Sequence, residues 1–296
     1  LNTALNSYPV NEKYLFQKVK VLHKLDRTAM ASQTLLELLE LNPSHKGANE
    51  LNKKLKIAQK INVASVTYEL NVFNKIFSER HLLNVTLSKK TKYGMIIGRA
   101  SLANRFEKKG MQYEIDAYPR IRSGTYAYLN FGISYSSLFP SRRYGVELHQ
   151  KLPKSFEFSV GLRYLEFSAS NPKIITGSIG KYYKNYWFSL RPYITPKSYG
   201  TSTSINFIVR NYLKNANNFI ALTVGMGVSP DERGRLVNDE SLYKLKSYKG
   251  SFGFQKTLSP LVRARFRIGY FLEEVQFSLG DYSSRYSFSG GLIANF

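Results

Sequence analysis

Arginine stands at every second position of the segment Arg263–Arg267, and apolar residues stand between and beyond these arginines. Successive side chains of a β-strand point to opposite faces. A strand over Leu261–Glu273 would therefore carry Arg263, Arg265 and Arg267 on one face and apolar side chains on the other. Guanidinium groups bind carboxylates and phosphates through paired N–H donors. The segment thus predicts a strand with one face suited to contact an anionic solute.

Other charged residues are predicted to share the inward face of the strands, and their signs are separated along the sequence. The acidic residues are Glu114, Asp116, Glu147 and Glu157, and the basic residues are Arg163, Arg191, Arg210 and Lys249, together with the three arginines above. An acidic wall opposite a basic wall would orient a polar or anionic solute in transit. The second interpretation is mutual ion pairing that fills and stiffens the interior. The sequence leaves both open.

Residues for catalysis are few. His149 stands two positions from Glu147 on the same predicted face, an arrangement that a lipid- or glycan-modifying barrel enzyme would use as a base. A G-x-S-x-G nucleophile motif, metal-ligand spacing, a phosphate-binding loop and a dinucleotide fingerprint are all absent from the sequence, and the chain has no cysteine. We therefore predict no catalytic residue, no metal and no cofactor, with His149 as a structural residue.

The charge of the chain is strongly basic. Lys and Arg number 43 against 20 Asp and Glu, which gives a formal net charge of +23. Nucleic acid is the usual partner of such a chain, but these residues are spread over strands and turns and form no recognition motif. We therefore predict no nucleic-acid partner. An anionic lipopolysaccharide surface or an anionic cargo accounts for the same charge.

The elements that must position these residues are short alternating segments, which we count as fourteen between Ile61 and Phe296. The fourth is predicted over Gly110–Pro119 and the last over Ser283–Phe296. A transmembrane β-barrel typically has an even number of amphipathic strands, short connections on one side and longer connections on the other. The segments here are even in number, and the one long connection, Ser229–Lys244, lies on the side opposite the short ones. We therefore predict a mainly β fold with an antiparallel barrel over residues 61–296. A soluble sandwich is the alternative, and we expect the long connection to be exposed outside the cell.

The last segment ends in an aromatic residue at the carboxy terminus. Phe288, Leu292 and Phe296 share one face, and this pattern resembles the signal by which bacterial outer-membrane proteins are recognised for insertion. It predicts a barrel-assembly machinery as a partner, besides outer-membrane lipid and lipopolysaccharide.

Residues 1–60 have a different character, because apolar residues recur there at helical spacing. Leu22, Ala31, Leu35 and Pro43 match large, small, large and proline positions of the tetratricopeptide pattern, so the segment resembles one degenerate repeat of this kind. A single repeat cannot bury its own apolar face. We predict that Leu22, Ala31, Leu35 and Leu38 dock a protein partner. The chain starts at Leu1 without Met or a signal-peptide pattern, and we expect a processed form.

A helical repeat followed by a barrel rich in Tyr, Gly and Arg and ending in Phe resembles the YaiO family of outer-membrane β-barrel proteins. The resemblance implies an outer-membrane location with the helices in the periplasm. The chain resembles exopolysaccharide exporters more distantly, because those have many repeats and a larger barrel. The favoured interpretation is a non-enzymatic subunit of a larger envelope complex. A conduit for export of an anionic or polysaccharide cargo is the first alternative, and a lipid- or glycan-modifying enzyme is the second.

Overall fold

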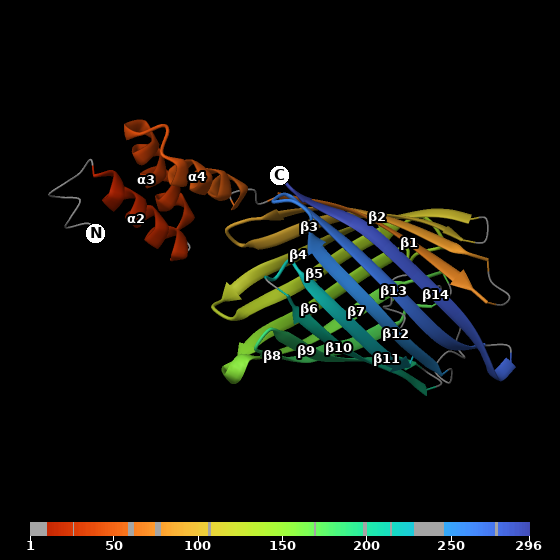
Figure 1. The fold of residues 1–296 in the computed structure, drawn as a ribbon. Coiled ribbons are helices and arrows are strands. Elements are labelled where there is room, and N and C mark those ends of the chain that lie inside the picture. The colour runs from red at the N-terminus through yellow and green to blue at the C-terminus, as the bar shows by residue number, and fades with distance from the viewer. Residues whose placement is uncertain are drawn as a thin grey trace. The chain divides into compact units, whose positions relative to one another are not determined.

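The computed structural model describes residues 11–25, 27–58, 62–74, 78–105, 108–168, 170–197, 200–213, 215–227, 246–275 and 278–296. The chain divides into a helical unit, which precedes Asn62, and a barrel unit (Figure 1). None of the described helices has the length and apolar content of a membrane span. The predicted connection Ser229–Lys244 lies outside the described residues.

The helical unit contains α2 (Glu12–Lys24), α3 (Thr28–Leu41) and α4 (Lys46–Ala58). The side chain of Asn11 caps α2 by accepting a hydrogen bond from the backbone N–H of Tyr14 at 3.2 Å. One apolar stripe from each helix meets in a common core. That core consists of Leu15, Val19, Leu22, Ala31, Leu35, Leu38, Ala48 and Leu55.

The placement of the docking residues needs correction. Leu22, Ala31, Leu35 and Leu38 are all buried in the core of the helical unit, and the last three have no exposed surface. They pack against the other helices, so a partner could contact them only if the unit unfolded. The sequence predicted an apolar face that one repeat could not bury. In the structure this face is buried within the helical unit, because Ala48 and Leu55 of α4 pack in the same core.

Within the described residues, fourteen strands form a closed antiparallel barrel in which β1 pairs with β14, so the predicted fold is confirmed. The strands are β1 (Asn62–Phe73), β2 (Arg80–Lys90), β3 (Gly94–Arg105), β4 (Lys108–Arg122), β5 (Thr125–Ser134), β6 (Arg142–Leu152), β7 (Phe156–Glu166), β8 (Lys173–Tyr183), β9 (Tyr186–Lys197), β10 (Gly200–Tyr212), β11 (Phe219–Gly227), β12 (Ser247–Thr257), β13 (Val262–Val275) and β14 (Ser278–Asn295). A one-turn 3₁₀ helix, η1 (Pro153–Ser155), joins β6 to β7.

Alternation separates the two faces of the barrel wall. On β5, Leu129 and Phe131 are 44% and 45% exposed on the outside, whereas Asn130 between them is 6% exposed on the inside. A transmembrane barrel needs this apolar outer face because lipid offers no hydrogen bonds, and it tolerates polar groups only inside. The alternation in the sequence therefore decides which side chains reach the lumen.

The fourth strand is longer than predicted, because pairing continues past Pro119. Proline cannot donate to a sheet ladder and usually ends a strand or stands beside a bulge. Here Pro119 is paired opposite Gly94, and the register shifts between Arg120 and Arg122. The irregular register accommodates the proline, and the strand runs on to the turn at Ser123.

The two ends of the barrel differ. We call the end where β1 begins and β14 ends the terminal end, and the opposite end the distal end. The connections at the terminal end are short; the turn between β4 and β5 consists of Ser123 and Gly124. Gly94 opens β3 at this end with a φ of +149°, and a Cβ there would lie 2.0 Å from the carbonyl oxygen of Tyr118. Only glycine fits this position without a shift of the backbone.

Candidate functional site

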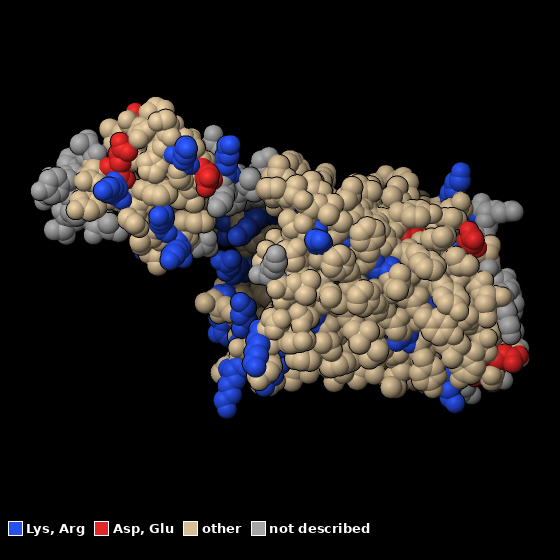
Figure 2. Space-filling view, viewed as in Figure 1, with Lys and Arg blue, Asp and Glu red and all other residues tan. Residues whose placement is uncertain are grey.

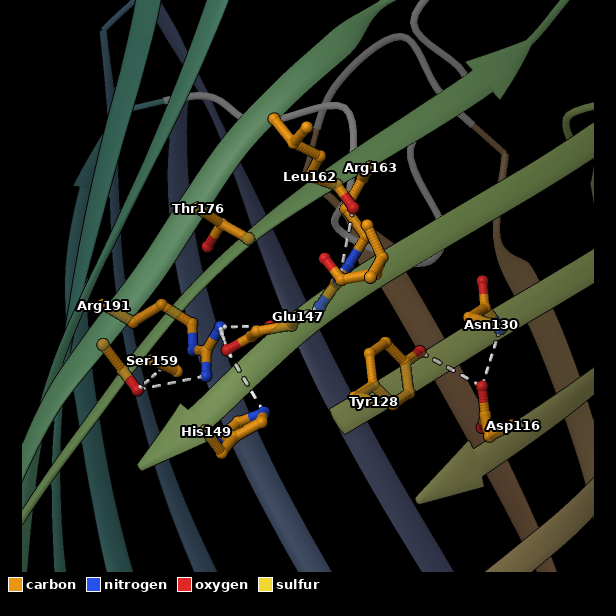
Figure 3. Close-up of polar contacts among 12 residues, drawn as sticks. Asp116, Tyr128, Asn130, Glu147, His149, Ser159, Leu162, Arg163, Thr176 and Arg191 are labelled. Carbon is orange, nitrogen blue, oxygen red and sulfur yellow. Dashed lines mark hydrogen bonds and ion pairs between the residues drawn. The ribbon is translucent and has the colours of Figure 1, made fainter. Parts of the chain in front are cut away.

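A first cluster of charged groups lies inside the barrel on β3 to β6. Asp116 and Glu114 on β4 accept hydrogen bonds from Arg99 on β3, at 2.8 and 3.2 Å. Asn130 on β5 donates to both carboxylates, at 2.6 and 3.1 Å, and the Tyr128 hydroxyl donates to Asp116 at 3.1 Å (Figure 3). Both carboxylates are almost completely buried. Their charges are compensated within the wall itself.

A second cluster surrounds Glu147 on β6. Arg163 on β7 approaches one carboxylate oxygen to 2.6 Å, and Arg191 on β9 approaches the other to 2.9 Å (Figure 3). His149 lies 3.5 Å from the same carboxylate and stacks on Tyr126, with ring centroids 4.5 Å apart and planes 4° from parallel. Glu147 is 2% exposed. Two guanidiniums thus hold the carboxylate that would otherwise orient the imidazole as a base.

A third cluster joins an aromatic group to Glu157 on β7. The indole N–H of Trp187 on β9 donates to Glu157 Oε1 at 2.7 Å. Arg210 on β10 lies over the rings of Trp187 and Phe219, with its guanidinium carbon 5.1 and 4.4 Å from their centroids. Cation–π contacts of this kind hold a guanidinium in place without neutralising it.

The arginines of β13 have a different environment. Arg263 donates to the side-chain oxygen of Asn217 at 2.8 Å, and Arg265 donates twice to Gln255 on β12, at 2.9 and 2.6 Å. Gln255 is a buried inner-face residue directly opposite Arg265 in the register, so Arg265 points into the barrel. Among the described residues, the charges that act on Arg265 are the guanidiniums of Arg210, Arg263 and Arg267, and none is a carboxylate.

Arg267 completes this row. It lies opposite Gly253 on β12, so no side chain faces it across the strand pair. Within the part of the chain that the structure describes, no side-chain hydrogen bond or ion pair is seen at Arg267, and Arg267 is exposed, as Arg265 is. Exposure on the inner face means contact with the interior of the barrel. These two guanidiniums are therefore available to a solute.

The charge distribution differs from an acidic wall opposite a basic wall. Glu114, Asp116 and Glu147 are neutralised by arginines on other strands nearby, so the side of β3 to β9 has little net charge. Lys249 lies on the inner face of β12, opposite Phe271. Sequence reasoning missed Arg99 and Arg143, which pair with Glu114. The weak alternation of β3 hid Arg99, and the doublet at 142–143 left the face of Arg143 ambiguous.

The family model of the YaiO membrane β-barrel domain matches residues 61–232, more than half of the chain. The chain belongs to the YaiO membrane β-barrel family. No curated protein matches it. The predicted family is confirmed, whereas the tetratricopeptide character of the helices stays a prediction.

Solved structures share the fold at low sequence identity. The CymD monoaromatic hydrocarbon channel is 10% identical, with a TM-score of 0.54 and coverage of 83% of this chain and 92% of that chain. A bacterial polysaccharide outer membrane secretin is 7% identical, with a TM-score of 0.51 and coverage of 80% and 99%. The YaiO protein is therefore an outer-membrane β-barrel, and its fold is similar to that of these two proteins.

Proposed function

We propose that this YaiO protein is a conduit for anionic solutes and that Arg265 and Arg267 are their contacts inside the lumen. One observation carries the proposal. Both guanidiniums lie on the inner face, both are exposed to the interior, and the charged groups around Arg265 are cations.

Clustering of like charge inside a barrel is costly, because a low-dielectric wall strengthens the repulsion between the guanidiniums. The chain neutralises the carboxylates of β4 and β6 with arginines but places no described carboxylate beside Arg265. A purely structural interior would favour balanced pairs, as around Glu147. An uncompensated row instead attracts anions and raises their local concentration.

The terminal end adds to this field. Exposed cations stand in and beside its turns: Lys89, Lys90, Lys92, Arg120, Arg122, Lys151, Lys154, Lys181, Lys184 and Lys256. Figure 2 shows Lys and Arg gathered at this end of the barrel, on the left, whereas the distal end on the right carries both basic and acidic residues. The turns of the terminal end contain no Asp or Glu. This asymmetry would draw anions to the terminal mouth first.

We infer that the terminal end and the helical unit are periplasmic. Outer-membrane barrels have short periplasmic turns and longer extracellular loops. All connections of the terminal end are short, and the longest connection, between β11 and β12, belongs to the distal end. The distal connections would then face lipopolysaccharide. Anions would enter from the periplasm, which is the direction of export.

Ion selectivity in planar bilayers tests the conduit. The wild-type protein should conduct with a preference for anions, and Arg265→Gln with Arg267→Gln should shift the reversal potential in a salt gradient toward cations. Arg142→Gln is the matched control, because Arg142 is an exposed residue at the distal rim, 3.5 Å from Glu166. A correctly folded barrel that stays silent, or a double variant with unchanged selectivity, would contradict the proposal.

A second candidate function, a subunit of an envelope complex, is favoured by the surface of the helical unit. Val21, Leu25, Met30, Leu36 and Leu41 are exposed apolar side chains, and a contiguous patch of such residues would mark a protein interaction site.

Exchange of one of these side chains tests the complex. Leu36→Glu should release a partner that co-purifies with the wild-type protein from native membranes. Gln33→Glu is the control, because it adds the same charge at an exposed position of α3. Equal recovery of the partner with both variants would exclude this surface as the interface.

A further inference from the structure

Aromatic side chains gather on the inner face of the barrel toward its terminal end. They come from two groups of neighbouring strands, β4–β5 and β8–β11: Tyr118 on β4, Tyr126 and Tyr128 on β5, Tyr182 on β8, Trp187 on β9, Tyr212 on β10 and Phe219 on β11. The register places Tyr182 opposite Trp187 and Tyr212 opposite Phe219. Residues on the outer face of a membrane barrel must be apolar because they contact lipid, but residues on the inner face contact no lipid. Contact with lipid therefore does not explain why these rings are present.

Rings on adjacent strands contact one another in each of the two groups. Tyr118 lies 6.5 Å from Tyr126, and Tyr182 lies 6.3 Å from Trp187, measured between ring centroids. The register places Tyr182 directly opposite Trp187, so the two rings share the inner face. Tyr182 is 44% exposed although it points inward. The surface is therefore open to the lumen.

Charged groups stand at both sides of this surface. Glu157 uses one carboxylate oxygen to accept from Trp187, and its second oxygen has no hydrogen bond within the described residues. Arg210 lies over Trp187, and the strand register aligns it with Arg267 through Ala221 and Gly253. Arg210 therefore stands between the aromatic side chains and the arginines of β13. An accepting carboxylate, flat rings and a row of guanidiniums thus line one stretch of the lumen.

Each part matches one feature of an acidic sugar. The C–H groups of a pyranose face carry partial positive charge and pack on the electron-rich face of an aromatic ring. A carboxylate accepts hydrogen bonds from sugar hydroxyls, and guanidiniums bind the carboxylates of uronic acids in a bidentate manner. A nucleic-acid strand would place a phosphate for every base near Glu157, where the like charge disfavours it.

We propose that the lumen holds a binding subsite for an anionic oligosaccharide. Tyr126, Tyr182 and Trp187 stack on sugar rings, Glu157 accepts from hydroxyls, and Arg210, Arg265 and Arg267 bind the acid groups. This inference deepens the proposed conduit, since it names the class of anion that passes, and it rests on the lumen being open.

Trp187 gives a direct readout, because it is the single tryptophan of the chain. The full-length protein in detergent is titrated with a short oligogalacturonate while tryptophan emission is followed, and calorimetry measures binding independently of fluorescence. Emission should change saturably. A neutral maltooligosaccharide of equal length, and Arg265→Gln with Arg267→Gln, should each weaken binding by about tenfold or more, because charge-assisted hydrogen bonds are lost. Arg142→Gln should bind like the wild type.

The outcomes separate this inference from the conduit. Absence of oligogalacturonate binding by both methods, with anion-selective conductance intact, would overturn the saccharide subsite and leave the conduit standing. Equal affinity for citrate or for oligothymidylate would replace the saccharide by a general anion or a nucleic-acid strand. Equal affinity for the neutral sugar would show that the arginines do not bind the acid groups, which contradicts an anion-specific subsite. Binding without conductance would keep the subsite and refute transport.

Discussion

Removal of the Glu147 carboxylate should destabilise the barrel far more than removal of a carboxylate at its rim. Glu147 is 2% exposed and lies 2.6 Å from Arg163 and 2.9 Å from Arg191. Glu147→Gln keeps the shape of the side chain but leaves two guanidiniums without a counter-charge. Breaking a buried ion pair from one side costs about 3–5 kcal/mol. Arg191 is partly exposed and can regain water, so we expect the lower part of this range, about 3 kcal/mol.

Glu166→Gln is the matched control, because it makes the same chemical change in an exposed pair. Glu166 lies 3.5 Å from Arg142, whose side chain is 61% exposed. Exposed pairs contribute about 0–1 kcal/mol. Urea unfolding in detergent micelles or lipid vesicles measures the free energy of unfolding of each variant. The double variant Glu147→Gln with Arg191→Gln should recover part of the loss, because one uncompensated charge is removed.

Equal costs for Glu147→Gln and Glu166→Gln would refute this reasoning. Water inside the barrel would then solvate Arg163 and Arg191 even without the Glu147 carboxylate. An arginine inside the barrel would need no carboxylate partner, and the lack of one beside Arg265 would carry no meaning. The same measurement therefore tests the electrostatic argument for the arginines of β13.

Three further predictions concern insertion, backbone conformation and register. Phe296→Asp should lower the yield of membrane-inserted protein, because it places a charge in the carboxy-terminal signal, whereas Asn295→Asp should insert normally; equal yields in membrane fractions would exclude this role. Gly94→Ala should destabilise the barrel by about 2 kcal/mol or more, because φ is +149° and a Cβ would meet backbone at 2.0 Å, whereas a Cβ at Gly98 on the same strand meets nothing within 4 Å. Urea unfolding compares the two alanine variants, and similar midpoints would be the contrary result. Arg265→Cys should react with a small aqueous thiol reagent and not with a lipid-phase reagent, and labelling from lipid would show a register wrong by one residue.

The sequence by itself determined the strands of this protein and the face to which each side chain points. The alternation of apolar and polar residues along a strand can be read from the local sequence. Polar side chains must avoid lipid, so a segment such as Val262–Tyr270 has only one possible orientation in the barrel wall. The number and approximate positions of the fourteen strands followed from this pattern, although the last strand begins at Ser278 and was predicted to begin at Ser283. The fourth strand was predicted too short. The sequence shows that Pro119 lacks the N–H that a sheet ladder needs, but the register shift that accommodates Pro119 depends on the pairing with β5.

The tertiary structure alone decided the partners. Arg191 on β9 reaches Glu147 on β6 across two intervening strands, and no sequence spacing encodes that approach. The same holds for the aromatic group, whose rings come from strands spread over a hundred residues of sequence. In the helical unit, periodicity identified the apolar stripe that contains Leu22 and the stripe that contains Leu35 and Leu38, but only the packing of three helices showed that both stripes are internal. The pattern of apolar and polar residues determines which face a side chain occupies. The pairing of strands and the packing of helices determine which residues that side chain contacts.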